Sequence, residues 1–234
     1  DVYARLYAER LSRELGQPVI TENRGGAGGA IGSLEVSRAR PDGYTLLFGT
    51  ASTHALYPLV TRQPQFDVVR DFTTIAELGG GPLCWLAHPS RPATLREFLA
   101  AARAANPPLS YGSPGSGTTL HQGGRARMLA VATARRLDAA PDVPTVAEAL
   151  GLASFEAVLW HAVFAPPALP APILERLSAA TNSALADPAF RASLAASGIA
   201  ASAPGTPASA AAFIAAETAR YRPVVEAIRP ELEQ

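Results

Sequence analysis

The fold class rests on three consecutive stretches: Pro18-Val-Ile-Thr-Glu-Asn23, Arg24-Gly-Gly-Ala-Gly-Gly-Ala-Ile-Gly32 and, after a Pro41-Asp-Gly turn, Thr45-Leu-Leu-Phe-Gly-Thr50. The first predicts a short strand and the last a buried strand, because both are rich in residues that favour extended backbone. Between them the glycines predict a tight turn, with a helix over residues 30–40. A strand, a helix and a second strand in this order are typical of a parallel sheet covered by helices, so the sequence predicts an α/β protein.

The same alternation continues along the chain. Hydrophobic spacing predicts further strands within 75–88, 109–112, 128–134 and 155–165, and helices over 1–15, 94–105, 172–186, 188–197 and 207–228. The capping box Thr145-Val-Ala-Glu148 starts one more short helix. Pro223 is expected to kink or break the last helix near its end.

Composition excludes several classes of function. The 234 residues include 20 basic and 20 acidic side chains with no basic block, which excludes a basic surface that binds the phosphate backbone of nucleic acids. No apolar run approaches the roughly 20 residues that span a bilayer, so membrane insertion is not expected. Every basic residue is arginine, which excludes a P-loop lysine and a Schiff-base lysine. Cys84 is the only cysteine, so no disulfide forms within the chain.

The motif Tyr111-Gly-Ser-Pro-Gly-Ser-Gly-Thr-Thr-Leu-His121 carries the most specific chemistry. Its small residues lie between a predicted strand and a predicted helix, where uncovered N–H groups and the helix dipole favour an anion. Apart from His121 it offers no acid, base or metal ligand, so it indicates a place that holds a small carboxylate without transforming it. A similar turn follows the predicted strand at 49–54, and ligands of open parallel sheets bind beyond such strand ends.

Three other sites are weaker interpretations. A dinucleotide fingerprint would need a glycine where Ile31 stands and an acidic residue after the next strand. The four histidines show no i, i+4 pair, so neither a metal site nor a cofactor is predicted. Ser113 and Ser116 both lack the flanking glycines of a nucleophile elbow, although a hydrolase using either serine stays an alternative.

A set of strings in a fixed order spans nearly the whole chain. It comprises Leu15-Gly-Gln-Pro-Val-Ile-Thr-Glu-Asn-Arg24 with the glycine run after it, Pro41-Asp-Gly-Tyr-Thr-Leu-Leu47, Gly49-Thr50 with Thr53-His54-Ala55 and Pro58, the 111–121 motif, Asp142-Val-Pro-Thr-Val-Ala-Glu148 and Phe164-Ala-Pro166. Together these strings resemble the tripartite tricarboxylate transporter receptor family, the Bug-type extracytoplasmic solute receptors.

The resemblance implies a two-lobed periplasmic binding protein fold of type II-like architecture, each lobe a mostly parallel sheet flanked by helices. Residues 1–85 and 165–234 would form the first lobe and 86–164 the second. The implied function is that of a monomeric, non-enzymatic periplasmic receptor whose signal peptide has been removed. It would capture a small carboxylate, such as a di- or tricarboxylate, an amino acid or an aromatic acid, for the membrane permease of a tripartite transporter or for a sensor.

The resemblance also implies the residues that bind the ligand. These are Thr50, Ser52 and Thr53 in the first lobe, Ser113, Gly115, Ser116, Gly117, Thr118, Thr119 and His121 in the second, and Trp160. Relatives carry a further segment between positions like Gly124 and Arg125, and a strand and loop before Asp1, so a truncated second lobe is expected. The alternatives are the hydrolase, the effector domain of a regulator and a remnant that binds nothing.

Overall fold

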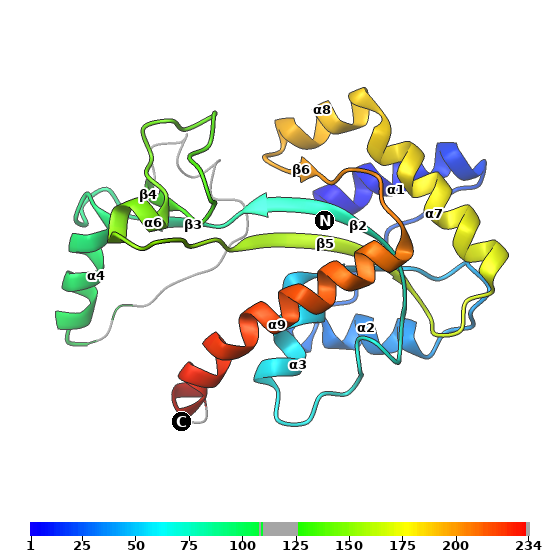
Figure 1. Cartoon of the computed structure of the whole chain (residues 1–234), viewed down its shortest axis with the longest axis horizontal. Coiled ribbons are helices and arrows are strands. Elements are labelled where there is room, and N and C mark those ends of the chain that lie inside the picture. The colour runs from blue at the N-terminus through cyan, green and yellow to red at the C-terminus, as the bar shows by residue number, and fades with distance from the viewer. Residues whose placement is uncertain (108, 110–125, 233–234) are drawn as a thin grey trace. The chain divides into compact units, whose positions relative to one another are not determined.

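The computed structural model describes residues 1–107, 109 and 126–232, and the chain divides into two compact units. Unit 1 comprises Asp1–Gly80 and Trp160–Gln234, and unit 2 comprises Gly81–Leu159 (Figure 1). The helices are α1 (Val2–Leu15), α2 (Ala30–Ser37), α3 (Tyr57–Val60), α4 (Leu95–Ala104), α6 (Val146–Leu150), α7 (Ala171–Ala186), α8 (Pro188–Ala196) and α9 (Pro207–Leu232), with a 3₁₀ turn η1 (Ala27–Gly29) and a π-helical turn η2 (Ser52–Leu56). The strands are β1 (Leu47–Thr50), β2 (Thr73–Pro82), β3 (Cys84–Ala87), β4 (Arg127–Val131), β5 (Val158–Ala165) and β6 (Ala200–Ala201). The predicted α/β class is confirmed.

Unit 1 is built on a four-stranded sheet in the order β1-β5-β2-β6. One face packs on α1, α7 and α8, where Tyr7 Oη and Thr181 Oγ1 share a buried hydrogen bond of 2.8 Å. The other face packs on η2, where His54 stacks on Phe164 of β5, and on α9, where Phe213 meets Trp160 edge-on at 5.7 Å. Helices therefore cover the sheet on both faces, which explains the nearly continuous apolar sequence of β5.

Unit 2 has a smaller framework. Strands β3 and β4 pair antiparallel, with a bulge between Trp85 and Leu86, and α4 and α6 pack near them. The predicted capping box is confirmed at α6: Glu148 N–H donates to Thr145 Oγ1 at 3.1 Å, and Thr145 N–H donates to the Glu148 carboxylate at 2.8 Å. Most of the predicted strand 109–112 lies outside the described residues.

Strand direction differs from the expected mostly parallel sheets. The pairs β1–β5, β2–β6 and β3–β4 all run antiparallel, so the parallel prediction is wrong for them. The prediction assumed that strands close in sequence are neighbours in the sheet, where a helical crossover makes them parallel. Here β1 pairs with β5, far along the chain, and the intervening helix does not set its direction.

A predicted strand and a predicted helix break are absent from the described residues. Residues 18–23 form no strand; Ile20 is 83% exposed, and Val19 N–H donates to Ser12 Oγ of α1 at 2.8 Å instead of to a neighbouring strand. Helix α9 continues through Pro223 to Leu232 without breaking there. Pro223 and Ala219, whose carbonyl loses its partner, are both exposed, so water can bond that carbonyl. In the part of the chain that is described, no helix combines the length and apolarity needed to cross a membrane.

Candidate functional site

The predicted first-lobe turn begins where β1 ends. Thr50 N–H donates to Thr53 Oγ1 at 3.0 Å, and Thr53 N–H donates to Thr50 Oγ1 at 3.3 Å. Thr53 is buried, with 9% of its surface exposed, whereas Ser52 is exposed. The two threonines thus fix the start of the η2–α3 helical segment, and Ser52 is the residue of this turn whose side chain faces solvent.

The glycine run packs directly against this turn. Gly29 has a φ of +94°, and a Cβ at this position would lie 2.6 Å from Thr53 Cγ2. An added methyl group would therefore collide with the side chain that organises the turn. The prediction of a tight turn is confirmed.

His54 lies beneath the turn in an aromatic cluster. Its ring stacks on Phe164 with centroids 4.2 Å apart and meets Phe72 edge-on at 5.0 Å. Gly49 makes room for it, because a Cβ there would lie 2.9 Å from His54 Nδ1 and 2.5 Å from Phe164 Cε2. Burial lowers the pKa of His54 to about 3, so the imidazole is neutral at physiological pH. His54 Nδ1 lies 2.8 Å from Thr53 Oγ1, so the imidazole takes part in the hydrogen bonding of the turn.

Trp160 lies at the same end of the sheet as the turn. Thr50 pairs with His161 in the β1–β5 ladder, which places Trp160 next to the last residue of β1. The indole is 1% exposed, and its Nε1 has no hydrogen-bond partner among the described residues. The structure thus gathers Thr50, Ser52, Thr53 and Trp160 in unit 1, with Trp160 as a core residue. Contact of the indole with a ligand stays a prediction.

The second-lobe part of the predicted site cannot be placed in the same way. Ser113, Gly115, Ser116, Gly117, Thr118, Thr119 and His121 all lie outside the described residues. Within residues 1–107, 109 and 126–232, no group of three or more His, Cys, Asp or Glu side chains is arranged to hold a metal ion.

Comparison with known families decides which proteins this one is related to. The model of the tripartite tricarboxylate transporter family receptor matches residues 3–125 and 120–229. The chain belongs to this receptor family. A relative from Pseudomonas sp. (strain P51), the UPF0065 protein of the tcbD-tcbE intergenic region, is 30% identical over 286 residues, covering 100% of this chain and 84% of its own. BugT from Bordetella pertussis is 28% identical over 275 residues, covering 96% of this chain and 84% of its own.

Solved structures of periplasmic binding proteins share the receptor's fold. A protein of R. palustris with adipate is 26% identical, with a TM-score of 0.87 and coverage of 97% of this chain and 91% of the other. MatC from Rhodopseudomonas palustris with bound malate is 28% identical, with a TM-score of 0.87 and coverage of 96% and 94%. These likenesses confirm the predicted periplasmic binding protein fold.

The receptor lacks residues that its relatives have within the aligned region. Its alignment to the Pseudomonas relative runs over 286 residues, against the 234 of this chain. The two family matches meet at residues 120–125, and the expected gap between Gly124 and Arg125 falls there, outside the described residues. The shorter length is consistent with a truncated second lobe.

Proposed function

We propose that this receptor captures a small carboxylate through hydroxyl and backbone N–H groups and does not catalyse a reaction. The observation that carries the proposal is the Thr50–Thr53 pair of hydrogen bonds, which fixes a helix start beneath the exposed Ser52. A helix start presents N–H groups without intrahelical partners, and these favour a negative charge. The adipate and malate found with two relatives are both dicarboxylates, which supports this class of ligand.

The binding residues follow from the same reasoning. Ser52 would donate to the carboxylate, and Thr50 and Thr53 would hold the turn in place. The predicted second-lobe contacts are Ser113, Gly115, Ser116, Gly117, Thr118, Thr119 and His121, with Trp160 as a wall of the site. The receptor would act as a monomer in the periplasm and pass its solute to the permease of a tripartite transporter or to a sensor. The family description, a receptor of tripartite tricarboxylate transporters, supports the permease as partner.

Calorimetric titration with adipate, malate and their diamides tests the proposal. The diamides keep the carbon chain and remove the charge, so heat of binding is expected from the dicarboxylates alone. Ser52→Ala should weaken binding about tenfold, the effect of one hydrogen bond to a charged group. Ser193→Ala is the matched control, because Ser193 is also exposed in unit 1 and its hydroxyl group donates to the Ala189 carbonyl of its own helix.

Two results would count against the proposal. Equal binding of a dicarboxylate and its diamide would exclude recognition of the charge. A folded protein that binds no member of a wider panel of carboxylic acids would favour the remnant.

A further inference from the structure

A cavity of about 860 Å³ lies wholly within unit 1, and the proposed function does not use it. The segment from Pro64 to Thr74 and one face of α9 line it, together with His54, Pro58 and Leu59. Cavities of roughly 300–1,000 Å³ are the size that holds small molecules in proteins. This volume is therefore sufficient for a ligand of its own.

The helix α9 leaves room on the face that lines the cavity. Ala211, Ala215 and Ala219 recur there at four-residue spacing, and all three are exposed. Deeper in the cavity, Phe66 and Phe72 are 3% and 5% exposed and meet edge-on at 5.5 Å. The cavity thus combines an aromatic floor with a wall of small side chains, a shape that suits a flat apolar ring.

One residue that lines the cavity carries a buried polar atom without a partner. His54 lines the cavity, is fully buried, and its Nε2 has no hydrogen-bond partner among the described residues. Thr53 Oγ1 accepts from Thr50 N–H and donates to the Thr50 carbonyl at 3.2 Å, so its contact with His54 Nδ1 is best satisfied when Nδ1 carries the hydrogen. Nε2 is then an acceptor, and an O–H donor from a ligand would satisfy it.

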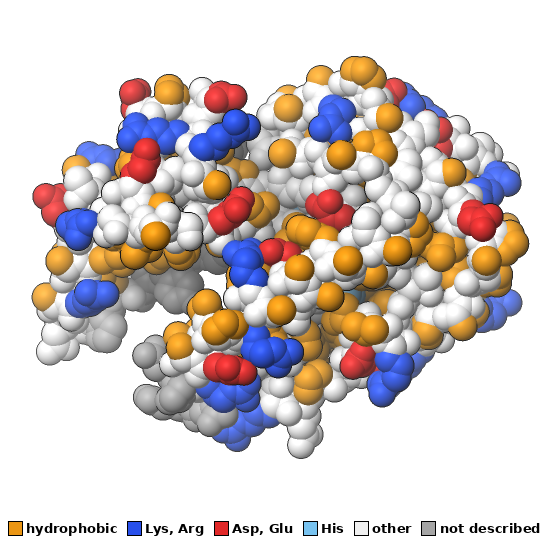
Figure 2. Space-filling model, viewed as in Figure 1, with side chains coloured by type: hydrophobic (Ala, Val, Ile, Leu, Met, Phe, Trp, Pro, Cys, Tyr) orange, Lys and Arg blue, Asp and Glu red, His pale blue; other side chains and the backbone are white. Residues whose placement is uncertain are grey.

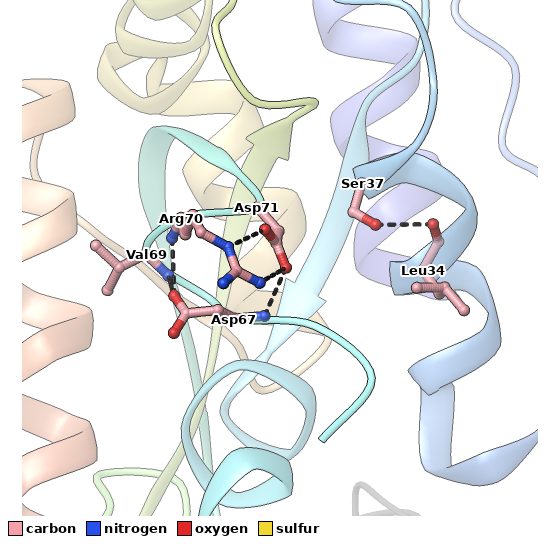
Figure 3. Close-up of polar contacts among 6 residues, drawn as sticks. All are labelled: Leu34, Ser37, Asp67, Val69, Arg70 and Asp71. Carbon is pink, nitrogen blue, oxygen red and sulfur yellow. Dashed lines mark hydrogen bonds and ion pairs between the residues drawn. The ribbon is translucent and has the colours of Figure 1, made fainter. Parts of the chain in front are cut away.

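The rim of the cavity offers one available positive charge. Arg70 is held by two hydrogen bonds to the Asp71 carboxylate, at 2.8 and 3.1 Å, and Asp67 accepts from the backbone N–H groups of Val69 and Arg70 (Figure 3). The Val69 side chain points away from these contacts and is 86% exposed (Figure 3). Arg222 also lines the cavity and forms no ion pair with any described residue.

Hydrophobic and basic side chains are mixed on the surface around this region. Figure 2 shows orange side chains beside blue ones over α9 and α3, and the exposed apolar residues there include Val60, Val224 and Ile228. An anionic group with an apolar body is the ligand type that fits such a surface.

We propose that the cavity between residues 64–74 and α9 is a second ligand site, for a hydroxylated aromatic carboxylic acid. Its ring would lie among Phe66, Phe72 and the alanines of α9, its hydroxyl group would donate to His54 Nε2, and its carboxylate would meet Arg222. This site is separate from the exposed face of the Ser52 turn, and the two proposals can fail independently.

The test is a titration of the whole chain with 4-hydroxybenzoate, followed by NMR of ¹³C-labelled isoleucine methyl groups. Ile214 lines the cavity, whereas Ile20 is exposed elsewhere in unit 1. The Ile214 signal is expected to shift and saturate while the Ile20 signal stays in place. An Ile214 signal that does not move at millimolar ligand overturns the proposal, whatever the dicarboxylate titration shows.

A matched pair of variants assigns the binding to the cavity. Ala215→Trp fills the cavity, and Ala212→Trp adds the same ring at another exposed position of α9 that does not line the cavity. Only Ala215→Trp should abolish the saturating shift. If both or neither abolish it, the cavity is not the site.

The chemistry of the ligand is tested with two analogues and one further variant. Benzoate lacks the hydroxyl group and 4-hydroxybenzamide lacks the charge, and each should bind about tenfold more weakly than 4-hydroxybenzoate. Arg222→Gln should remove the advantage of 4-hydroxybenzoate over the amide and keep its advantage over benzoate. If all three compounds bind equally, the proposed contacts of the ligand with His54 and Arg222 are wrong.

Discussion

In unit 1 the central strand β5 is buried on both faces, whereas in unit 2 the β3–β4 pair leaves Trp85 43% exposed. The core of unit 1 joins α1, α7 and α8 to the sheet in one cluster, and the described residues of unit 2 form smaller clusters around Leu129 and Val131. The first unit thus has a framework that can hold a turn or a cavity rigidly. The described part of the second has smaller buried clusters, so its helix caps contribute a larger share of its stability.

The largest effect is expected when a buried side chain in the core of unit 1 is shortened. Leu185 is fully buried in the main cluster, and Leu185→Ala should lower the free energy of unfolding by about 3–4 kcal/mol. Leu129→Ala, in the smaller cluster of unit 2, should cost about 2–3 kcal/mol because fewer neighbours lose contacts.

The two tryptophans make this comparison measurable. Trp160 lies in unit 1 and Trp85 in unit 2, so urea unfolding of the Trp85→Phe protein by fluorescence follows unit 1 alone. Leu185→Ala should move that transition more than Leu129→Ala does. If both variants shift this transition equally, the two units unfold together, and the difference between their cores does not give them different stabilities.

A smaller effect is expected where β1 approaches the His54 cluster. Gly49→Ala would place a methyl group 2.5 Å from Phe164 Cε2, and overpacking of this kind costs about 1–3 kcal/mol. Gly25→Ala is the control, because a Cβ there meets nothing within 4 Å. The unfolding transition reported by Trp160 should move for Gly49→Ala alone. A similar shift in both variants would mean that the lost backbone freedom of glycine, and not packing, sets the change in stability.

Local signals in the sequence account for much of the fold. The apolar spacing of α1 and α4 predicted these helices to within one residue at each end, and the capping box predicted the start of α6, because the interactions that define them lie within a few residues. The pairing of β1 with β5 was not predicted, because it joins segments that are far apart in the chain. The Thr50–Thr53 turn was visible as a cluster of hydroxyl residues. The cavity was not, because it needs α9 to cover residues 64–74.

The His54 cluster should also make unit 1 sensitive to acid. The folded pKa of His54 is about 3, below the ordinary value of 6.5, so between these two values the unfolded chain binds the extra proton. Stability is therefore complete above pH 6.5 and falls as the pH drops towards 3, by at most about 1.4 kcal/mol per pH unit from this group.

Variants separate this effect from that of other titrating groups. Burial also lowers the pKa of His161, to about 4, and that contribution remains in every variant at position 54. His54→Asn keeps a donor for Thr53 and removes the titration, so it should reduce the loss of stability between pH 7 and pH 5 in urea titrations. His88→Asn, at an exposed position of unit 2, is the control substitution. Equal pH profiles for wild type and His54→Asn would show that the imidazole is protonated in the folded state.

The smallest effect is expected at the cap of α6 in unit 2. Thr145→Ala removes the hydroxyl oxygen that accepts from Glu148 N–H, and loss of such a cap costs about 1 kcal/mol. Thr145→Ser keeps the hydroxyl group and should restore most of the stability. Because unit 2 has the smaller core, this loss should appear in the Trp85 fluorescence at lower urea than any change in Trp160. An equal shift of both signals, or no rescue by serine, would place the stability of unit 2 outside its helix caps.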